Sequence, residues 1–407
     1  MRQADIVIAG AGLAGSTAAA MLSRAGYDVL LVDPHPTYPP DFRCEKLDRS
    51  QIEILKKTGM ADAVLKAATP DRSLWVARFG HLVEKREGAQ CGIFYDNLVN
   101  TMRAQVPGAV FVAAKVTAIA TSGDRQTITL STGEEISARL IVLANGLNIG
   151  LRHNVGIERN VLSEAHSISI GFNIKPVGQP AFDFSALTYY SERPESRVAF
   201  VTFFPIGSTI RANLFVYRDM HDPWLSQFRN APKQTLLATL PNLQKLTGPF
   251  EVDGAVKIRP VDLYVSEGHR QPGIVLVGDA FATSCPAAGT GAGKAFMDVE
   301  RLCHVHIPQW LATPGMGQEK IAAFYDDPVK RAYDAACTKK AYWLRSFSID
   351  RGLYRTAERW GKFVLHWLKG ALRRPSAPAA VEAPALVPAQ SPDGAQAHEP
   401  TRARQNV

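Results

Sequence analysis

Cysteine is scarce in this sequence of 407 residues. The cysteines are odd in number and widely separated, so they do not form the dense framework of a small disulfide-stabilised secreted domain. No pair has the Cys-x-x-Cys spacing of zinc and dithiol redox sites, and the Cys303-His304-Val305-His306 run fits no zinc pattern either. We therefore expect a protein of a reducing, cytoplasmic compartment that holds no metal. The five cysteines are Cys44, Cys91, Cys285, Cys303 and Cys337.

Long apolar runs are also missing, because no stretch reaches the roughly 18 residues that a membrane-spanning helix needs. The net charge of +8 is concentrated in one place, since Lys330 to Arg374 holds twelve Lys/Arg against Asp334, Asp350 and Glu358. The remainder of the chain is close to neutral and has no basic patch beside a recognition motif, so nucleic-acid binding is not expected. We expect a soluble or membrane-peripheral protein of two or three domains.

Glycine, in contrast, has a regular spacing near the N-terminus. The apolar run Asp5–Ala9 is followed by Gly10, Gly12 and Gly15, then by an Ala-rich helical run and a second apolar strand that ends at Asp33. In a dinucleotide-binding unit the first glycine permits a tight turn, the second admits a pyrophosphate, and the third lets the helix pack close to the sheet. Unpaired N–H groups at the helix start attract the phosphates, and the terminal acid accepts hydrogen bonds from a ribose.

A secretory signal peptide is the alternative interpretation of this stretch, since Arg2 precedes an apolar run to about Leu22. A lone G-x-G-x-x-G also occurs by chance. Against both alternatives, the stretch has glycines at fixed positions, no A-x-A-like cleavage site soon after them, and a second strand that ends in an acid. We therefore favour the dinucleotide interpretation.

Two further strands return the chain to this first sheet. Leu140–Ala144 and Gly273–Val277 are fully apolar, which is typical of buried parallel strands. The first is followed by Asn145-Gly146, and the second by Gly278-Asp279, a loop at 286–294 and a helix to about residue 303. The patterns also predict helices over 48–58 and 94–105, and strands over 109–121, 125–131 and 134–144.

Between these returns the sequence changes to alternating apolar and polar residues, the pattern of strands with one buried face. Strands are predicted over 165–173, 186–191, 197–204, 209–217 and 252–265, with a helical stretch near 222–240. Residues 71–94 supply further short strands. We expect a mostly antiparallel sheet here and assign it to substrate handling.

The order of these motifs resembles that of the FAD-dependent monooxygenase family of the para-hydroxybenzoate hydroxylase type, the class A flavoprotein monooxygenases, with relatives such as geranylgeranyl reductases. The resemblance spans residues 1–330. It implies an α/β fold in which an FAD-binding, Rossmann-like domain of the glutathione-reductase type carries an inserted, mostly antiparallel β-sheet substrate domain and a C-terminal helical segment. The FAD-binding domain would comprise 1–70, 92–158 and 268–330, the substrate domain 71–91 and 159–267, the basic aromatic helices 331–374, and a disordered tail 375–407.

The resemblance also implies which residues contact FAD. Asp33 would hold the adenosine ribose, Arg43 would reach the phosphate or ribityl region, and Asp279 would bond the ribityl hydroxyls. Val116 would offer its backbone to the adenine, and Asn145 belongs to the motif that touches both FAD and the nicotinamide donor. The other members form the glycine turn, the late strand end and the loop under the isoalloxazine: Gly10, Gly12, Leu13, Ala14, Gly15, Gly278, Pro286, Gly289, Thr290, Gly291 and Ala292.

Several positions depart from the family pattern. Asn145 and Ile149 stand where the middle motif usually has Asp and Ser, although Arg152 is kept. NAD(P)H is the expected electron donor, but these changes alter the motif that would contact it. Lys294 replaces a frequent Asn, and Tyr95 stands where an Arg is usual. The W-x-W-x-I-P pattern of flavin halogenases is absent, which argues against halogenation.

By resemblance we expect an FAD-dependent oxidoreductase, first of all a monooxygenase that hydroxylates an aromatic or apolar small molecule through a flavin C4a-hydroperoxide. Two alternatives stay open, a reductase of prenyl or other lipid chains and a flavin-binding partner without turnover. The catalytic residues are not identified, because the cofactor performs most of the chemistry. Candidates, each with an ordinary core or loop role as the alternative, are Glu45, Lys46, Tyr189, Tyr190, Phe203, Phe204, Arg211 and Cys285.

The C-terminal segment 342–372 combines aromatic and basic residues. Trp343, Phe347, Trp360, Val364 and Trp367 recur at helical spacing among Arg and Lys. A basic helix with Trp on its apolar face is typical of membrane-interfacial helices. The alternative is a helix packed on the flavin domain with its basic residues solvated. Peripheral membrane contact is thus one expectation, while substrate identity and oligomeric state are left open.

Overall fold

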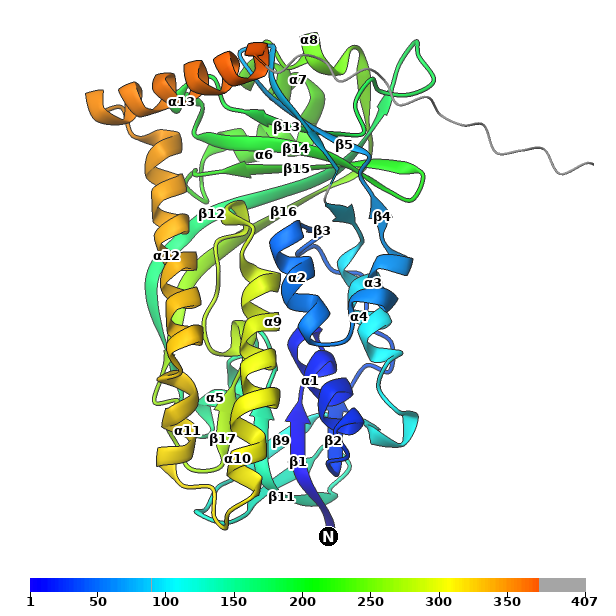
Figure 1. The fold of residues 1–407 in the computed structure, drawn as a ribbon, viewed down its shortest axis with the longest axis vertical. Helices are drawn as coiled ribbons and strands as arrows, with labels where there is room; N and C mark the ends of the chain where they lie inside the picture. The colour runs from blue at the N-terminus through cyan, green and yellow to red at the C-terminus, as the bar shows by residue number, and fades with distance from the viewer. Residues whose placement is uncertain (89, 373–407) are drawn as a thin grey trace, which may run out of the picture.

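The computed structural model describes residues 1–88 and 90–372, so the tail predicted at 375–407 lies outside the described residues. Figure 1 shows an elongated molecule with one sheet and its helices towards the end that holds the N-terminus, and a second sheet at the opposite end. This arrangement agrees with the predicted α/β fold with an added antiparallel sheet. No helix among residues 1–88 and 90–372 is both long and apolar enough to cross a bilayer.

The first sheet is built around the parallel strands that the sequence predicts. β1 (Arg2–Ala9) lies between β2 (Val29–Asp33) and β11 (Glu135–Leu143), and β17 (Ile274–Leu276) pairs with the last residues of β11, all in parallel. Two antiparallel strands, β10 (Gln126–Leu130) and β9 (Val116–Ala120), lie beyond β11, and β8 (Phe111–Ala113) lies beyond β2. The strand order is β8-β2-β1-β11-β10-β9. Residues that follow parallel strands gather at one edge of a sheet, which is where open α/β sheets bind their ligands.

The single strand predicted over 109–121 is wrong. The chain forms β8 (Phe111–Ala113), which is parallel to β2, and then β9, which pairs with β10 at the other end of the strand order. A tight turn separates the two strands, because the Ala114 N–H donates to the Val112 carbonyl at 3.0 Å. Alternating apolar residues run through this turn, so the sequence pattern did not show it.

Short helices connect the strands of the first sheet. A capping box begins α2 (Arg49–Lys57), since Asp48 accepts from Gln51 N at 3.0 Å and Gln51 Oε1 accepts from Asp48 N at 2.8 Å. α1 (Leu13–Arg24) packs against α4 (Tyr95–Arg103) and α9 (Gly291–Arg301). The other helices are α3 (Ala61–Ala67), α5 (Gly150–His153), a π-helical turn at Leu302–His306, α10 (Ile307–Leu311) and α11 (Gln318–Tyr325).

The second sheet is almost entirely antiparallel and has the order β16-β12-β15-β14-β13-β5-β6. Its strands are β5 (Ser73–Arg78), β6 (His81–Glu87), β12 (Glu158–Pro176), β13 (Ala186–Tyr190), β14 (Val198–Ile206), β15 (Thr209–Val216) and β16 (Phe250–Glu267). β12 is much longer than the predicted 165–173, β16 extends two residues beyond the predicted 252–265 at each end, and the two strands pair from Glu158–Glu267 to Pro176–Phe250. A small sheet of β3 (Lys46–Leu47), β7 (Cys91–Gly92) and β4 (Thr69–Pro70) lies between the two large ones (Figure 1).

The two faces of the second sheet have different environments. One face forms an apolar core with α6 (Pro223–Asn230), α7 (Pro232–Thr239) and α8 (Gln244–Thr247). The single helix predicted near 222–240 is divided at Ala231, because Pro232 cannot continue a helical hydrogen-bond ladder. Polar residues alternate with this core and form what we term the polar face. Six are buried, Ser167, Ser169, Thr188, Thr202, Arg211 and Asn213, and Asn173 is half-buried.

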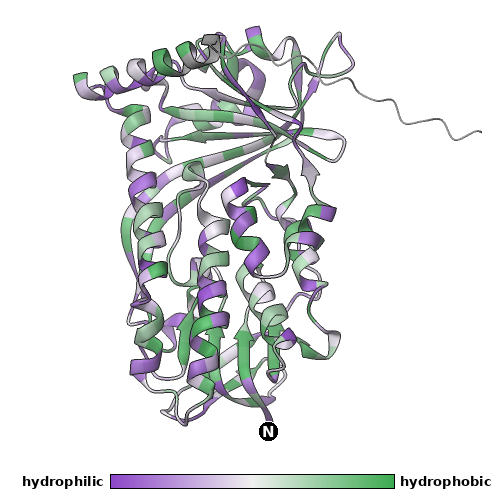
Figure 2. Cartoon of the chain, in the orientation of Figure 1, coloured by the Kyte–Doolittle hydropathy of each residue, from purple (hydrophilic) through white to green (hydrophobic). Residues whose placement is uncertain are grey.

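Two C-terminal helices follow, as the sequence predicts. Asp327 begins α12 (Pro328–Ile349) by accepting from Val329 N and Lys330 N, both at 2.9 Å. α12 runs alongside α9 and reaches the second sheet, and α13 (Leu353–Leu372) then crosses the outer end of the molecule (Figure 1). Figure 2 shows apolar residues on α13 as well as in the strands of the first sheet.

A buried cluster of charges joins α12 to the first sheet. Asp298 on α9 accepts from Gly278 N at 2.9 Å and forms ion pairs with Lys294 at 3.2 Å and Lys330 at 2.8 Å. Asp334 pairs with the same two lysines at 3.0 and 2.7 Å. Burial alone would raise the pKa of Asp298, but the two lysines hold it below its usual value. The late strand turn, α9 and α12 therefore share one electrostatic centre.

We expect Asp298→Asn to lower the free energy of unfolding by about 3–5 kcal/mol, because breaking a buried ion pair leaves charge without compensation. Asp326→Asn is the matched control. Asp326 forms an ion pair with Arg270 on the surface, where the side chains of Asp326 and Arg270 are 52% and 40% exposed. The control should lose about 1 kcal/mol or less. Urea denaturation of the full chain measures both, and equally small losses would contradict the assignment of the cluster as a structural centre.

Candidate functional site

The glycine turn between β1 and α1 has the backbone geometry that its spacing predicts. Gly10 has φ +104°, and a Cβ there would lie 2.7 Å from the Ala144 carbonyl oxygen. A Cβ on Gly15 would lie only 1.8 Å from Gly10 O, so this glycine sets the close packing of helix and turn. A Cβ on Gly12 meets nothing within 4 Å, and no side chain caps the start of α1. The turn therefore leaves open space beside the Leu13 and Ala14 backbone, which suits an anion at a helix N-terminus.

Asp33 at the end of β2 is fixed beside this turn. Its Oδ2 accepts from Ala11 N at 2.8 Å and its Oδ1 from His35 N at 2.9 Å. Arg103 from α4 donates through Nε to Ala11 O at 2.7 Å and lies 3.4 Å from Asp33 Oδ1. Sequence reasoning missed Arg103, although a basic residue in the last turn of a predicted helix was the available signal. Val116 is buried. It lies three residues after Ala113, which pairs with Asp33 where β8 runs beside β2.

Arg43 and Asp279, which are 236 positions apart in the sequence, form an ion pair with Nη1 and Oδ2 separated by 3.1 Å. Arg43 also donates through Nε to Asp41 at 2.6 Å, and its guanidinium lies 5.7 Å from the centre of the Tyr95 ring. Burial opposes the charged form of Arg43, but the neighbouring carboxylates outweigh it and raise its pKa. Tyr264 donates from its hydroxyl to the Asp279 carbonyl. The structure thus brings two predicted site residues together.

The motif Ala144-Asn145-Gly146 is joined to the Gly278-Asp279 turn by Arg152. This arginine is fully buried and donates to Gly146 O at 3.2 Å, to Ser266 Oγ at 3.0 Å and to Ala280 O. Asn145 donates to Asn148 O at 2.9 Å, while its buried Oδ1 has no hydrogen-bond partner among the described residues. An unpaired buried acceptor is costly, so Asn145 Oδ1 suits a ligand that brings a donor.

The loop Pro286–Gly291 leads into α9 and is held from α2. Gln51 Nε2 donates to Gly289 O at 2.9 Å, and Gly289 has φ +64°, a left-handed conformation that favours glycine. Thr290 is the N-cap residue that precedes α9, and its side chain makes no capping hydrogen bond. Gly291 and Ala292 are the first two residues of the helix. The loop contacts β12, β15 and α12, so it lies where the two large sheets meet.

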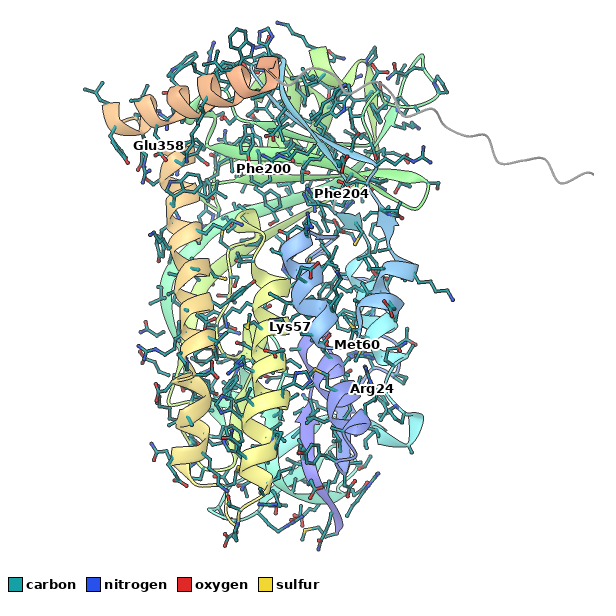
Figure 3. The ribbon with its side chains drawn as sticks, viewed as in Figure 1. Arg24, Lys57, Met60, Phe200, Phe204 and Glu358 are labelled. Carbon is teal, nitrogen blue, oxygen red and sulfur yellow. The ribbon has the colours of Figure 1, made fainter. Side chains whose placement is uncertain are left out.

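Two candidate residues just after Arg43 face the polar face of the second sheet. Glu45 accepts two hydrogen bonds from Arg211, at 2.7 and 3.1 Å, and both side chains are at most 5% exposed. Burial raises the pKa of Glu45 in spite of this arginine. Lys46 donates to Thr202 Oγ1 at 3.4 Å and lies 5.6 Å from the centre of the Phe204 ring. Figure 3 labels Phe204 and Phe200 on the second sheet.

Lys46 is an unusual cation, because burial of its ammonium group lowers its pKa. The charges of Asp48 and Asp71 only partly offset this burial. Thr202 in turn accepts from Thr188 at 3.3 Å. Beside the Glu45–Arg211 pair, the polar face therefore meets a second positive group, Lys46, with hydroxyls next to it.

The remaining candidates have structural roles. Tyr189 and Phe203 belong to the helix-covered core, and the Tyr189 hydroxyl accepts from Gly80 N at 2.8 Å and donates to Glu192. Tyr190 and Phe204 are their neighbours in the strands and point to the other side of the sheet. Cys285 is a buried thiol 3.5 Å from Ser167 Oγ, and burial raises its pKa, which keeps it unreactive. No group of three or more potential metal ligands occurs in the part of the chain that the structure describes.

Substitutions at Gly12 and Gly15 should have different effects, because a side chain at Gly12 enters open space whereas one at Gly15 meets the backbone of Gly10. Gly15→Ala forces a methyl group against Gly10 O, so we expect a lower midpoint of thermal unfolding without ligand. Gly12→Ala meets no protein atom, so its ligand-free midpoint should change little while FAD affinity falls at least about tenfold. Scanning fluorimetry and a flavin fluorescence titration measure the two quantities. A Gly12→Ala variant that binds FAD as tightly as the parent would disprove the assignment of the glycine turn as the FAD-binding turn.

Comparisons with known proteins agree with this geometry. Residues 3–307 match the family described as FAD binding domain. The chain is 24% identical over 319 residues to the 3-demethoxyubiquinol 3-hydroxylase of Escherichia coli (strain K12), covering 74% of this chain and 79% of that one. It is 29% identical over 165 residues to the menaquinone reductase of Mycobacterium tuberculosis (strain CDC 1551 / Oshkosh), covering 38% and 40%.

Among solved structures, the p-nitrophenol 4-monooxygenase of Pseudomonas putida DLL-E4 superposes with a TM-score of 0.71 at 15% identity and covers 91% of this chain and 95% of that one. This likeness shows a shared fold. The family match covers three quarters of the chain and includes the glycine turn, the middle motif and the Gly278-Asp279 turn. The chain therefore belongs to the FAD binding domain family, and it is an FAD-dependent oxidoreductase of the monooxygenase type.

Proposed function

We propose that this monooxygenase hydroxylates a phenol- or quinol-like ring held between the Pro286–Gly291 loop and the polar face of the second sheet. The carrying observation is the Lys46 ammonium, which is half-buried beside the Thr202 hydroxyl and the Phe204 ring on the polar face. Lys46 lies five residues before Gln51, which holds the loop through Gly289 O. The names of the hydroxylase relatives point to aromatic or quinol substrates, which supports the same class.

The cofactor contacts follow from the site described above. We propose the division of the chain into FAD and substrate domains as predicted, with the glycine turn at the pyrophosphate, Asp33 at the ribose and Val116 at the adenine. Arg43 and Asp279 would face the ribityl region, and the α9 N-terminus with Gly289 to Ala292 would lie under the ring, where its N–H groups favour negative charge. FAD, when bound, supplies the reaction with oxygen. The residues of this chain bind it, orient it and exclude water.

Lys46 would act on the substrate through charge. An ammonium group in a low-dielectric site stabilises a phenolate oxygen more strongly than it would in water. A phenolate ring is richer in electrons than the phenol and so is more reactive towards an electrophilic oxygen donor. Thr202 and Thr188 offer hydroxyls to the same oxygen, and Phe204 offers an apolar surface to the ring.

We propose NADH or NADPH as the electron donor. Arg152, the retained basic residue of the middle motif, is fully buried and occupied by Gly146, Ser266 and Ala280. Its N–H groups are therefore occupied within the protein, and Asn145 Oδ1 is an unpaired acceptor of that motif among the described residues.

A reductase of quinones or prenyl chains is the second candidate, and the similarity to a menaquinone reductase favours it. A reductase consumes the donor without placing oxygen in the product, whereas a monooxygenase inserts one atom. A flavin-binding partner without turnover is the third, and it would keep bound flavin that neither donor reduces.

The function is tested with purified protein, FAD, NADH or NADPH, and a panel of phenols and short-chain quinols under oxygen labelled with the heavy isotope. We expect donor oxidation to depend on one class of ring, with one labelled oxygen atom in each product by mass spectrometry. A reduced product free of label would establish the reductase instead, and flavin that no donor reduces would establish the non-catalytic partner.

The Lys46 assignment makes a separate prediction. Lys46→Met should weaken the binding of anionic phenols at least about tenfold, which corresponds to 1.4 kcal/mol, while FAD binding is retained. Lys46→Arg keeps the charge, and Lys175→Met, which removes a lysine with a 61% exposed side chain, is the matched control. Flavin difference spectra on titration with phenols measure the affinity.

The pH dependence has a defined sign. Burial lowers the pKa of Lys46, so the ammonium is present below that pKa and is lost as the pH rises through it, earlier than for an exposed lysine. Phenolate affinity of the parent protein should therefore fall at alkaline pH, and that of Lys46→Arg should not, because a guanidinium stays charged. Identical pH profiles for the two proteins would remove Lys46 from the site.

A further inference from the structure

The outward side of α13 is an apolar stripe. Among the described side chains of residues 353–368 the most exposed are apolar, apart from the phenol of Tyr354, and the most exposed charged one is Lys362 at 43%. Leu353 is 90% exposed, and Trp360, Leu365 and Trp367 are each at least 50% exposed. The outer stripe consists of Leu353, Tyr354, Ala357, Trp360, Gly361, Val364, Leu365, Trp367 and Leu368, which recur at the three- and four-residue spacing of one helix face.

Two charged residues of this helix, Arg359 and Glu358, turn inward instead. Arg359 is 6% exposed and donates to the carbonyls of Phe347 at 2.9 Å and Asp350 at 2.8 Å. Glu358 accepts from Trp343 Nε1 at 3.2 Å and pairs with Lys362 at 3.0 Å and with Arg355. Glu358 appears in Figure 3 where α13 passes the end of α12. An ordinary surface helix has the opposite arrangement, with charges outward.

The helix is also fixed in position. Phe79, at the turn between β5 and β6, stacks on Trp360 with ring centres 5.3 Å apart and packs edge-on against Phe363 at 5.4 Å. Phe79 has φ +54°, a left-handed conformation that is unfavourable for a bulky residue and persists only when its surroundings hold it. The outer stripe is therefore held away from the body of the protein rather than left free to fold back.

The position and the charge of α13 indicate which kind of surface its outer stripe binds. α13 crosses the outer end of the molecule, opposite the end that holds the N-terminus, so a flat surface can approach it from that end (Figure 1). From Arg351 to Arg374 the sequence has seven Lys/Arg against Glu358 alone, a local balance of +6. A second copy bound through the outer stripe would bring two such positive segments together, which like-charge repulsion opposes. An anionic lipid surface instead attracts this charge, and Trp and Tyr favour the boundary between headgroups and acyl chains.

We propose that α13 is a docking helix that lies in the headgroup region of an anionic membrane with its outer stripe in contact with the acyl chains. No described helix is able to span the bilayer, so the contact is peripheral. Membrane docking by α13 does not depend on the proposed catalytic activity. Only the further consequence, that the protein takes an apolar ring substrate from the membrane, rests on the proposed function.

The test uses the full chain loaded with FAD and vesicles of phosphatidylcholine with or without phosphatidylglycerol. We expect flotation with the anionic vesicles, weakened by salt, and at least a tenfold lower partition for the double variant Leu365→Glu/Trp367→Glu. Val161→Glu/Leu162→Glu is the matched control, because those side chains are 44% and 50% exposed on β12. Unchanged FAD content and thermal midpoint show that each variant is folded.

Three results would overturn the proposal: no vesicle binding by the parent protein, equal binding by the Leu365→Glu/Trp367→Glu variant, or a dimer in solution that this variant dissociates. The last result would assign the stripe to a second copy. Since the vesicle test requires no turnover, its failure leaves the labelled-oxygen result intact, and failure of the latter leaves the docking result intact.

Discussion

The carboxylate of Asp298 holds together stretches that are far apart in the chain. It accepts the Gly278 N–H, shares Lys294 and Lys330 with Asp334, and so fixes the turn after β17 against α9 and α12. Charges buried in this way are tolerated only when each has a partner. This requirement explains Lys294, which stands where an asparagine is frequent in similar sequences: an uncharged residue there would leave Asp298 and Asp334 with Lys330 alone. The acid at position 279, which pairs with Arg43, depends on the same turn.

The sequence predicted the parts of the fold in which local chemistry and tertiary packing agree. The strand, glycine turn and helix at residues 2–24 and the capped helix after Asp48 formed as expected. The turn at Ala114 was not predicted, because apolar residues continue through it, whereas the break at Ala231 was missed although Pro232 signals it in the sequence. The length of β12 was also missed, since its ends are exposed and irregular and carry little alternation.

The candidate site was predicted less completely, for a physical reason. Alternation shows that Tyr189 and Tyr190 lie on opposite faces of a strand, but it does not show which face helices cover. Only the position of α6 to α8 assigns Tyr189 to the core and leaves Thr188, Thr202 and Arg211 on the polar face. Arg152 is a similar case. Its place in the motif suggested a cofactor contact, whereas full burial makes it a link between two strand ends.

The long ladder of β12 and β16 sets how the two large sheets move relative to each other. A continuous pair of hydrogen-bonded strands resists bending, because bending lengthens its bonds. This ladder shifts register between Val161 and Ser167, where Ala165 has φ +38°, and again between Gly171 and Asn173. Flexing is therefore concentrated at these two places, so the molecule has a stiff elastic joint instead of a free hinge.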